Sequence, residues 1–371
     1  MKFLIFSHVV HVQKDGAYYG YGPYIKEMNL WSNYVDELWV IAPLVTDTNP
    51  DPIDLAYVHP RIKFIAVPSF QITSLSHLPA ALWASFIVLV KGVLYSAKAD
   101  HLHLRCPGNM GLLACMIQIF FPWKPKTAKY AGNWDRSAKK PWSYKLQQWI
   151  LNNTVLTHKM KVLAYGTWND QTKNVLPFFT ASYSFSQISS VQKGSLKEKI
   201  RLIFVGSMTP NKSPETAYWA AKQLATRQLP VELIFLGKGA ELNRLQKQAK
   251  EDGLEDSVHF LGNVPGDKVI EEFKNAHFLI FASQSEGWPK VVAEAMFWGC
   301  IPITTPVSCV PEMLGYGDRG FLIGQDKSKL IDYLLNLIES PELYREVSQK
   351  AMDWSRQFTL ESFEKKIGEL L

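Results

Sequence analysis

The stretch FLIFASQSEGWPKVVAEAMFWGCIPITT, residues 278–305, contains two apolar runs separated by a polar loop and an amphipathic segment. Phe278–Ala282 and Ile301–Thr304 have the composition of buried strands, and Lys290–Trp298 between them has the spacing of a helix. A strand, a helix and a second strand in such a short stretch are typical of a parallel sheet covered by helices. Ligands of these sheets bind beyond the carboxyl ends of the strands, so we expect the chemistry in the loop after Ala282.

The same alternation extends in both directions and is interrupted once. Strand and helix patterns follow each other from Lys2 to Ala164 and again from Ile200 to Thr304. Between them, Pro177–Ser195 is rich in Ser and Gln and poor in charge, which is typical of a linker. We therefore predict an α/β protein with two Rossmann-like, doubly wound domains facing a cleft. The predicted first domain is 1–180, and the predicted second domain is 196–355.

Length and composition exclude several classes of protein. With 371 residues, 47% hydrophobic and 20% charged, the chain suits two globular domains and not a disordered, collagen-like or coiled-coil protein. No secretory signal pattern is found in the first residues, and no C-x-x-C pair indicates zinc or redox chemistry. We expect buried free thiols and a cytoplasmic protein. The four cysteines are Cys106, Cys115, Cys300 and Cys309.

Charge is distributed unevenly. Residues 1–180 contain 18 Lys and Arg against 10 Asp and Glu, a net +8, whereas residues 181–371 contain 22 against 24, a net −2. From Trp123 to Lys161 there are nine basic residues against one acid, Asp135. Such a patch attracts lipid headgroups or phosphates, or it is a solvated face without a partner. No nucleic-acid-binding module accompanies it, so we do not expect nucleic acid as a partner.

One apolar segment resembles a membrane span. Leu78–Ala97 is long and hydrophobic, but Lys91 interrupts it, and a spanning helix needs about 20 nearly uncharged residues. We expect a buried or membrane-facing helix of a globular domain.

Three loops of the second half follow predicted strands and suit a diphosphate. Glu286 and Glu294 lie on either side of a predicted helix start, so both are expected to border one pocket. The free N–H groups of a helix start attract phosphate, and a nearby carboxylate can bind ribose hydroxyls. Lys212 follows the strand Ile200–Val205 at the mouth of the next helix. Gly237 follows another strand and allows a ligand to approach the backbone. Taken singly, the spacing of the two glutamates could arise by chance, Lys212 could be an ordinary surface lysine, and the loop at Gly237 could be a plain turn.

Taken together, the motifs resemble the donor-binding domain of retaining glycosyltransferase family 4, which has the GT-B fold. The resemblance is strong over 200–371 and loose over 1–180. Its elements are, in order, Phe204-Val-Gly206…Lys212, Leu236-Gly237-x-Gly239-x-Glu241, Val258-x-Phe260-Leu261-Gly262, Ser285-Glu286-Gly287…Glu294-Ala-Met and Gly299…Pro302.

The resemblance implies a retaining, metal-independent transfer of a sugar from a nucleotide-sugar donor to a glycan or lipid-linked acceptor, in surface polysaccharide or glycolipid synthesis. The nucleotide sugar is a co-substrate, and no cofactor is expected. Lys212 would neutralise the diphosphate, Glu294 would hold the ribose and Glu286 would lie against the donor sugar. Fixed positive groups would stabilise the charge that develops on the leaving diphosphate. A final helix within 356–371 is expected to cross back to the first domain.

Site residues follow from the same resemblance. The catalytic candidates are Glu286, Lys212, Asp135 and His103. The donor-binding candidates are Gly16, Gly206, Ser207, Lys212, Gly237, Gly262, Asn263, Glu286, Gly287, Trp288, Lys290, Val291 and Glu294. The acceptor-binding candidates are His8, His11, Tyr18, Arg105, Asn133 and Trp134.

The sequence departs from the family pattern at several positions. Ser207 stands where relatives commonly have a second phosphate-binding Arg, and Pro289, which has no N–H, ends a Gly-Trp-Pro triplet where they have Gly-Phe-Gly. In the first domain, Asp15–Tyr24 leads into a predicted helix, and its glycines are expected to form a loop that replaces the usual Gly-Gly loop, with a plain turn as the alternative. Asp100–Arg105 resembles the family's Asp-x-x-His element, whereas a later His is missing.

A basic and aromatic first domain suits an acceptor on a membrane. The protein is then expected to make peripheral contact with an anionic membrane, at the inner face of the cytoplasmic membrane. Two alternatives stay open: a non-catalytic nucleotide- or glycan-binding partner of another transferase, and a nucleotide-sugar epimerase of similar fold.

Overall fold

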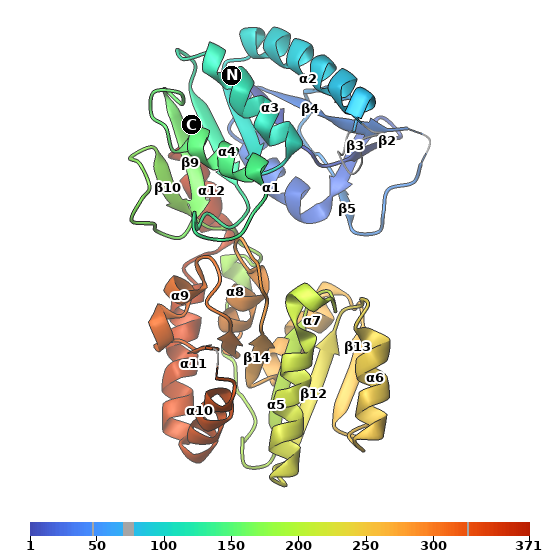
Figure 1. Ribbon diagram of the computed structural model, residues 1–371, viewed down its shortest axis with the longest axis vertical. Coiled ribbons are helices and arrows are strands. Elements are labelled where there is room, and N and C mark those ends of the chain that lie inside the picture. The colour runs from blue at the N-terminus through green and yellow to red at the C-terminus, as the bar shows by residue number, and fades with distance from the viewer. Residues whose placement is uncertain (47, 70–77, 325) are drawn as a thin grey trace. The chain divides into compact units, whose positions relative to one another are not determined.

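The computed structural model describes residues 1–46, 48–69, 78–324 and 326–371, and the chain divides into two compact units (Figure 1). Unit 1 consists of Met1–Phe178 together with Glu364–Leu371, and unit 2 consists of Phe179–Phe363. The boundary at Phe178 falls inside the segment that the composition indicates as a linker. Each unit contains a sheet with helices on both faces, so the predicted α/β, doubly wound fold class is confirmed.

Unit 2 has a parallel sheet in the order β13-β12-β11-β14-β15-β16. The strands are β11 (Ile200–Val205), β12 (Val231–Leu236), β13 (Val258–Gly262), β14 (Phe278–Phe281), β15 (Ile301–Thr304) and β16 (Phe321–Leu322). The helices are α5 (Pro214–Thr226), α6 (Leu242–Glu251), α7 (Gly266–Asn275), α8 (Lys290–Phe297), α9 (Val310–Met313), α10 (Ser328–Glu339) and α11 (Pro341–Ser355). The strand order reverses direction between β11 and β14, and such a switch point opens a crevice at the carboxyl ends of the two strands.

Unit 1 has a ten-stranded sheet in the order β10-β9-β8-β7-β1-β4-β2-β3-β5, with β6 also paired to β4. The strands are β1 (Lys2–Phe6), β2 (His11–Lys14), β3 (Ala17–Tyr21), β4 (Glu37–Val45), β5 (Asp54–Ala56), β6 (Ile62–Val67), β7 (His101–Cys106), β8 (Lys126–Tyr130), β9 (Met160–Tyr165) and β10 (Val175–Phe178). Its switch point lies between β1 and β7, which pair in parallel.

The expected glycine-rich loop at Asp15–Tyr24 is wrong. β2 and β3 form an antiparallel hairpin, and β3 also pairs antiparallel with β5. Gly16 occupies the hairpin turn with φ +77°, a conformation that a residue without Cβ adopts without strain. Gly16 therefore makes a strand-to-strand turn and not a strand-to-helix loop.

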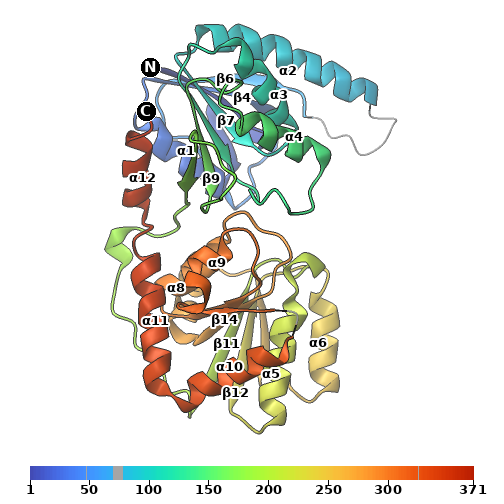
Figure 2. The same ribbon diagram turned by 60° about the vertical axis from the view of Figure 1, so that its left-hand side comes forward.

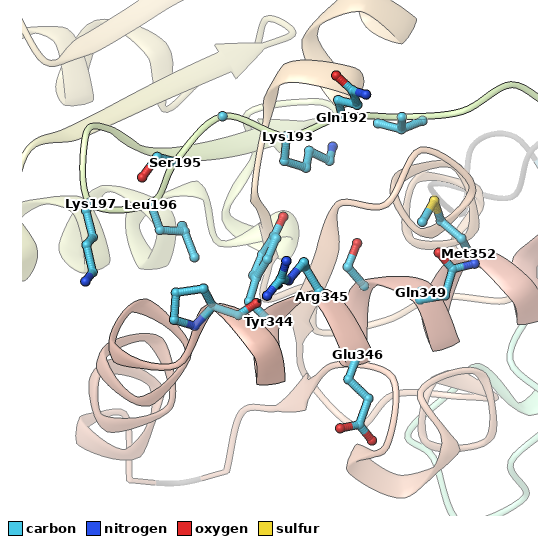
Figure 3. A pocket seen from close by; sticks show the side chains of 14 residues that line it. Gln192, Lys193, Ser195, Leu196, Lys197, Tyr344, Arg345, Glu346, Gln349 and Met352 are labelled. Carbon is cyan, nitrogen blue, oxygen red and sulfur yellow. Dashed lines mark hydrogen bonds between the residues drawn. The ribbon is translucent and has the colours of Figure 1, made fainter.

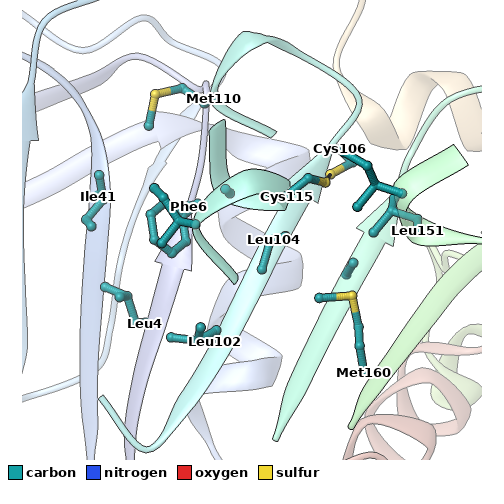
Figure 4. Close-up of a cluster of buried hydrophobic side chains, with 14 of the residues drawn as sticks. Leu4, Phe6, Ile41, Leu102, Leu104, Cys106, Met110, Cys115, Leu151 and Met160 are labelled. Atoms are coloured by element: carbon teal, nitrogen blue, oxygen red, sulfur yellow. Dashed lines mark hydrogen bonds between the residues drawn. The ribbon is translucent and has the colours of Figure 1, made fainter. Parts of the chain in front are cut away.

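Helices cover both faces of the unit 1 sheet. They are α1 (Gly22–Ser32), α2 (Leu78–Lys98), α3 (Asn109–Ile117), α4 (Trp142–Leu151) and the end of α12 (Leu360–Gly368). Leu4, Phe6, Leu102 and Leu104 point from the sheet into an apolar cluster shared with α2, α3 and α4 (Figure 4). Phe3, on the alternate face of β1, stacks on Trp31 of α1.

The end of α12 belongs to unit 1. Asn33 Nδ2 donates to Glu364 Oε1 at 2.7 Å, and Lys161 Nζ donates to the carbonyl of Leu370 at 2.9 Å. Figure 2 shows α12 beside α1.

Candidate functional site

The switch point of unit 2 brings Lys212 and Glu286 together. Lys212 ends a 3-10 turn (Pro210–Lys212) after β11, and Glu286 follows β14. The ammonium of Lys212 donates to Glu286 Oε1, with the two side chains 23% and 12% exposed, and lies 5.2 Å from the ring centroid of Phe281. The two residues with the strongest predicted roles therefore form one ion pair that solvent still reaches.

Hydrogen bonds hold the two loops that carry this ion pair. The N–H of Gln284 donates to the carbonyl of Asn211 at 2.8 Å, and the hydroxyl of Ser283 donates to the same carbonyl at 3.3 Å. Bonds from one loop to the other limit the movement of both side chains, which is what a preorganised site requires.

The glycines of the neighbouring loops allow these loops to pack closely. Gly237 has φ +131°, and a Cβ there would lie 2.0 Å from the carbonyl oxygen of Gly206. The N–H of Gly206 donates to the carbonyl of Leu236 at 2.9 Å, and that of Gly237 donates to the carbonyl of Gly262 at 2.7 Å. Gly237 therefore lets three loops pack against each other, and its contact with the donor stays a prediction.

Glu294 has another partner. It lies in the second turn of α8, and its Oε1 accepts a hydrogen bond of 2.5 Å from the hydroxyl of Ser182. Sequence reasoning missed Ser182, because it lies in the predicted linker far from any motif. Glu294 and Ser182 line a small pocket with Tyr183, Trp288 and Lys290, among others. That Glu286 and Glu294 border one pocket stays a prediction.

The other donor-binding candidates of unit 2 surround these residues. Ser207 and Asn263 are exposed, whereas Gly287, Lys290 and Val291 are half-buried. Trp288 is held by aromatic contacts, with its ring 6.1 Å from Trp354 and 5.7 Å from Phe358. Helix α8 begins after Pro289 without a side-chain cap, so its N-terminus keeps its positive dipole end for an anion.

A larger pocket of unit 2 lies elsewhere. It has a volume of about 790 Å³ and is lined by residues 191–197 and by α11 (Figure 3). Residues 191–197 precede β11, so the pocket lies beyond the amino ends of the strands, at the edge opposite the switch point. There Lys193 donates to the carbonyls of Phe273 and Ala276, and burial lowers its pKa to about 8.

The switch point of unit 1 contains a buried charge cluster. Glu27 Oε1 accepts from Arg105 Nη1 at 2.6 Å and lies 3.1 Å from Lys129 Nζ, with side chains 8%, 12% and 0% exposed. His8 follows β1 and Gly108 follows β7, and a Cβ on Gly108 would lie 3.5 Å from His8 Nδ1. Partial burial and the charge of Arg105 lower the pKa of His8. Arg105 and His8 are thus placed where a ligand of this sheet would bind.

Sequence reasoning missed Glu27 and Lys129. A signal was present, because Glu27 interrupts the buried face of α1 formed by Ile25, Met28 and Trp31. An acid on an otherwise apolar helix face needs a buried cation, since an unpaired buried charge is costly.

Three predicted site residues lie in the core. His103 is fully buried and stacks on Phe3. Its Nδ1 shares a hydrogen bond of 2.8 Å with the hydroxyl of Thr127, and burial holds its pKa well below the ordinary value. His11 is also fully buried beside Tyr57, and Trp134 is fully buried against Tyr130. Catalysis by His103 and acceptor contacts by His11 and Trp134 are therefore wrong, because a buried side chain does not reach a substrate.

Other candidates of unit 1 lie nearer the surface. Asp135 and Asn133 are half-buried, and Asp135 Oδ1 accepts from the N–H and the hydroxyl of Ser137 at 2.9 and 2.6 Å. Tyr18 is half-buried and stacks on Phe64. Their roles stay predictions.

The basic stretch from Trp123 to Lys161 is not one surface. Lys126 is buried and donates to the carbonyl of Phe121 at 3.1 Å, and burial lowers its pKa to about 8. Lys129 is buried against Glu27. The expected continuous patch is wrong, because β8 is buried along its whole length.

Comparisons with known proteins agree with this geometry. Residues 186–354 match the family described as "Glycosyl transferases group 1". Over 161 residues the chain is 29% identical to N-acetyl-alpha-D-glucosaminyl L-malate synthase of Bacillus anthracis, covering 43% of this chain and 41% of the relative. Over 142 residues it is 32% identical to an uncharacterized glycosyltransferase of Haemophilus influenzae, and this alignment covers 37% of this chain and 39% of the relative. The aligned part thus spans about two fifths of these curated relatives.

Solved structures resemble the whole chain. Anabaena Alr3699/HepE in complex with UDP and glucose aligns with a TM-score of 0.66 and 17% identity over 100% of this chain and 98% of that one. The lipopolysaccharide outer core galactosyltransferase WaaB in its apo form aligns with a TM-score of 0.70 and 15% identity over 100% and 99%. The protein therefore has the two-domain GT-B fold. The match to the group 1 glycosyl transferases covers residues 186–354, the part of the chain that contains Lys212 and Glu286.

Proposed function

We propose that the protein is a retaining, metal-independent glycosyltransferase that moves a sugar from a nucleotide-diphosphate sugar to a glycan or lipid-linked acceptor. The Lys212–Glu286 ion pair at the switch point of unit 2 carries this proposal. Lys212 would exchange Glu286 for the donor diphosphate, and the released carboxylate would face the sugar. A cation fixed beside the leaving diphosphate stabilises the charge that forms when the anomeric bond breaks.

The remaining donor contacts are proposed from neighbouring residues. Glu294 would exchange Ser182 for the ribose hydroxyls, and the N-terminus of α8 would lie against the phosphates. The HepE structure contains UDP and glucose, which supports a uridine-diphosphate sugar as the first donor to test. His8 would contribute to the acceptor side.

The acceptor and the location belong to the same proposal. The net charge of +8 in residues 1–180 favours an acceptor presented on an anionic membrane, and we place the protein in the cytoplasm at the inner face of that membrane.

Thermal shift with UDP-, GDP-, ADP- and CMP-sugars tests the donor site. A ligand that binds the folded state alone raises the melting temperature by mass action. We expect sugars of one nucleotide class to stabilise the wild type. Lys212→Ala should weaken the binding of that nucleotide sugar about 10- to 100-fold, since a charge-assisted hydrogen bond contributes about 1.5–3 kcal/mol. Glu294→Ala should weaken it as well. Lys238→Ala, an exposed cation in the next loop, is the matched control and should bind as the wild type does. Equal binding by all four proteins would exclude this site.

Stereochemistry and metal dependence need separate measurements. We expect the product anomer to keep the configuration of the donor by NMR, and transfer to continue in excess chelator. An inverted anomer, or activity lost in chelator and restored by a divalent cation, would contradict the proposed mechanism.

A further inference from the structure

Helix α2 packs on unit 1 with one face and leaves the other uncovered. Ala81, Ala84 and Val88 are buried against the sheet and α3. The opposite side carries large apolar side chains that are 40–63% exposed, and they recur at the three- and four-residue spacing of one helix face. These residues, called the α2 face below, are Leu82, Trp83, Phe86, Val90, Val93 and Leu94.

The apolar surface continues beyond the helix. Lys124 Nζ donates to the carbonyls of Ala97 and Ala99, so the chain next to Trp123 lies near the carboxyl end of α2. Trp123 is 62% exposed. In unit 2, by contrast, the large apolar side chains that stand exposed among the described residues are scattered: Phe185, Leu261 and Tyr316. A concentrated patch on one unit indicates an interaction surface.

Lysines border the α2 face. Lys91 donates to the carbonyl of Ala66 at 2.7 Å, Lys63 lies 5.1 Å from the ring centroid of Tyr95, and Lys98 is exposed at the end of the helix. Asp100 follows directly and offsets one of these charges. An apolar stripe with aromatic residues, bordered by cations, matches the interface of an anionic bilayer, where rings enter the headgroup region and ammonium groups meet phosphates.

The way α2 is packed decides between lying on a bilayer and crossing it. By length and composition, Pro79–Lys98 could cross a membrane, yet its buried residues fix it along the sheet of unit 1. A helix held on a folded domain in this way can enter the interface with its free face alone.

We propose that the α2 face, with Trp123, docks unit 1 on the interface of an anionic membrane. The inference deepens the proposed function and rests on it, because a membrane-borne acceptor gives the docking its purpose. The surface differs from the basic stretch indicated by the sequence: apolar side chains of α2 provide the contact, and the lysines around them provide the preference for anionic lipid.

Vesicle flotation with the full chain tests the docking without donor or acceptor. We expect the wild type to float with mixed phosphatidylglycerol–phosphatidylcholine vesicles, and less with pure phosphatidylcholine. Trp83→Ser/Phe86→Ser should lower the partition coefficient at least about tenfold, since two large apolar side chains no longer leave water. Phe185→Ser/Tyr316→Ser removes two aromatic residues of similar exposure from unit 2 and should float as the wild type does.

Three results would overturn the docking surface. The first is a wild type that does not float with vesicles, and the second is an α2 variant that floats as well as the wild type does. The third is a wild type that binds no vesicles but forms a dimer, together with an α2 variant that is a monomer, which would assign the α2 face to a second copy of the chain. The nucleotide-induced thermal shift of the α2 variant separates the two proposals. An intact shift with lost flotation supports docking, whereas flotation without any shift in the wild type leaves docking standing and removes the donor site.

Discussion

Both switch points bring a glutamate to cations, but in opposite environments. In unit 1, Glu27 meets Arg105 and Lys129, and none of the three side chains is more than 12% exposed. In unit 2, Glu286 meets Lys212, whose side chain is 23% exposed. A buried cluster cannot exchange partners without leaving an unpaired charge in the interior, whereas a solvent-reached cation can pass to a ligand. We infer that the cluster supports the fold of unit 1, whereas the pair in unit 2 is free to take the substrate role proposed for it.

The largest effect should come from breaking the buried cluster. Glu27→Gln removes the carboxylate that Arg105 and Lys129 share. Removal of one partner of a buried ion pair costs about 3–5 kcal/mol of unfolding free energy. Urea unfolding measures this loss.

Glu232 offers the matched control in unit 2. It also lies between two cations, Lys199 at 2.8 Å and Arg201 at 3.1 Å, but their side chains are 48% and 36% exposed. Glu232→Gln should therefore cost about 1 kcal/mol or less. If Glu27→Gln and Glu232→Gln lose the same free energy of unfolding, burial does not distinguish the unit 1 cluster from a solvent-exposed ion pair.

Acid should destabilise unit 1 more than unit 2. Burial lowers the pKa of His11 to about 4 and of His101 to about 3, and holds that of His103 well below its ordinary value. In unit 2, burial lowers the pKa of His277 to about 4. Below the unfolded value near 6.5, the unfolded chain binds protons that the folded chain does not, so stability is lost as the pH falls from 6.5 toward 4.

Hydrogen exchange of the full chain at pH 7 and 5.5 measures this difference. Each of the four histidines should cost about 1 kcal/mol at pH 5.5, which leaves unit 1 about 2 kcal/mol more destabilised than unit 2. Equal loss of protection in the two units would mean that the three histidines of unit 1 are not buried in their neutral form.

The same contrast explains what the sequence could predict. The strands of unit 2 contain apolar runs such as Leu233–Leu236 and Phe278–Phe281, which composition indicates as buried. β2 and β3 are short and lack such a run, and they are strands because they pair with each other and with their neighbours. A pairing that depends on distant residues leaves no local pattern, so the hairpin at Asp15–Gly16 was predicted as a loop.

Site residues follow the same rule. Lys212 and Glu286 belong to ordered local motifs, and the structure brings them together. Glu27 and Lys129 are far apart in sequence and meet through tertiary packing. From the sequence alone, a histidine in the core such as His103 cannot be distinguished from one in an active site. Burial separates the two cases, and burial is a property of the whole fold.

Two glycines with positive φ should separate a loop contact from a simple turn. A Cβ at Gly237 meets the carbonyl of Gly206 at 2.0 Å, whereas Gly253, with φ +67°, has nothing within 4 Å. Gly237→Ala should cost about 1–3 kcal/mol and weaken donor binding, because the loop that leads to Lys212 must shift. Gly253→Ala should cost about 1 kcal/mol from its left-handed backbone and leave binding unchanged. Thermal melts with and without nucleotide distinguish the two.

The smallest effect on stability should come from the ion pair that we assign to substrate. Lys212→Met keeps the contact with Phe281 and loses a partly exposed pair, so unfolding should change by about 1 kcal/mol or less. The same variant should lose most of its donor-induced thermal shift. A large loss of stability would place Lys212 with the structural cluster of unit 1, and the contrast between the two switch points would disappear. A small loss with weak donor binding is expected only of a cation whose main partner arrives with the substrate.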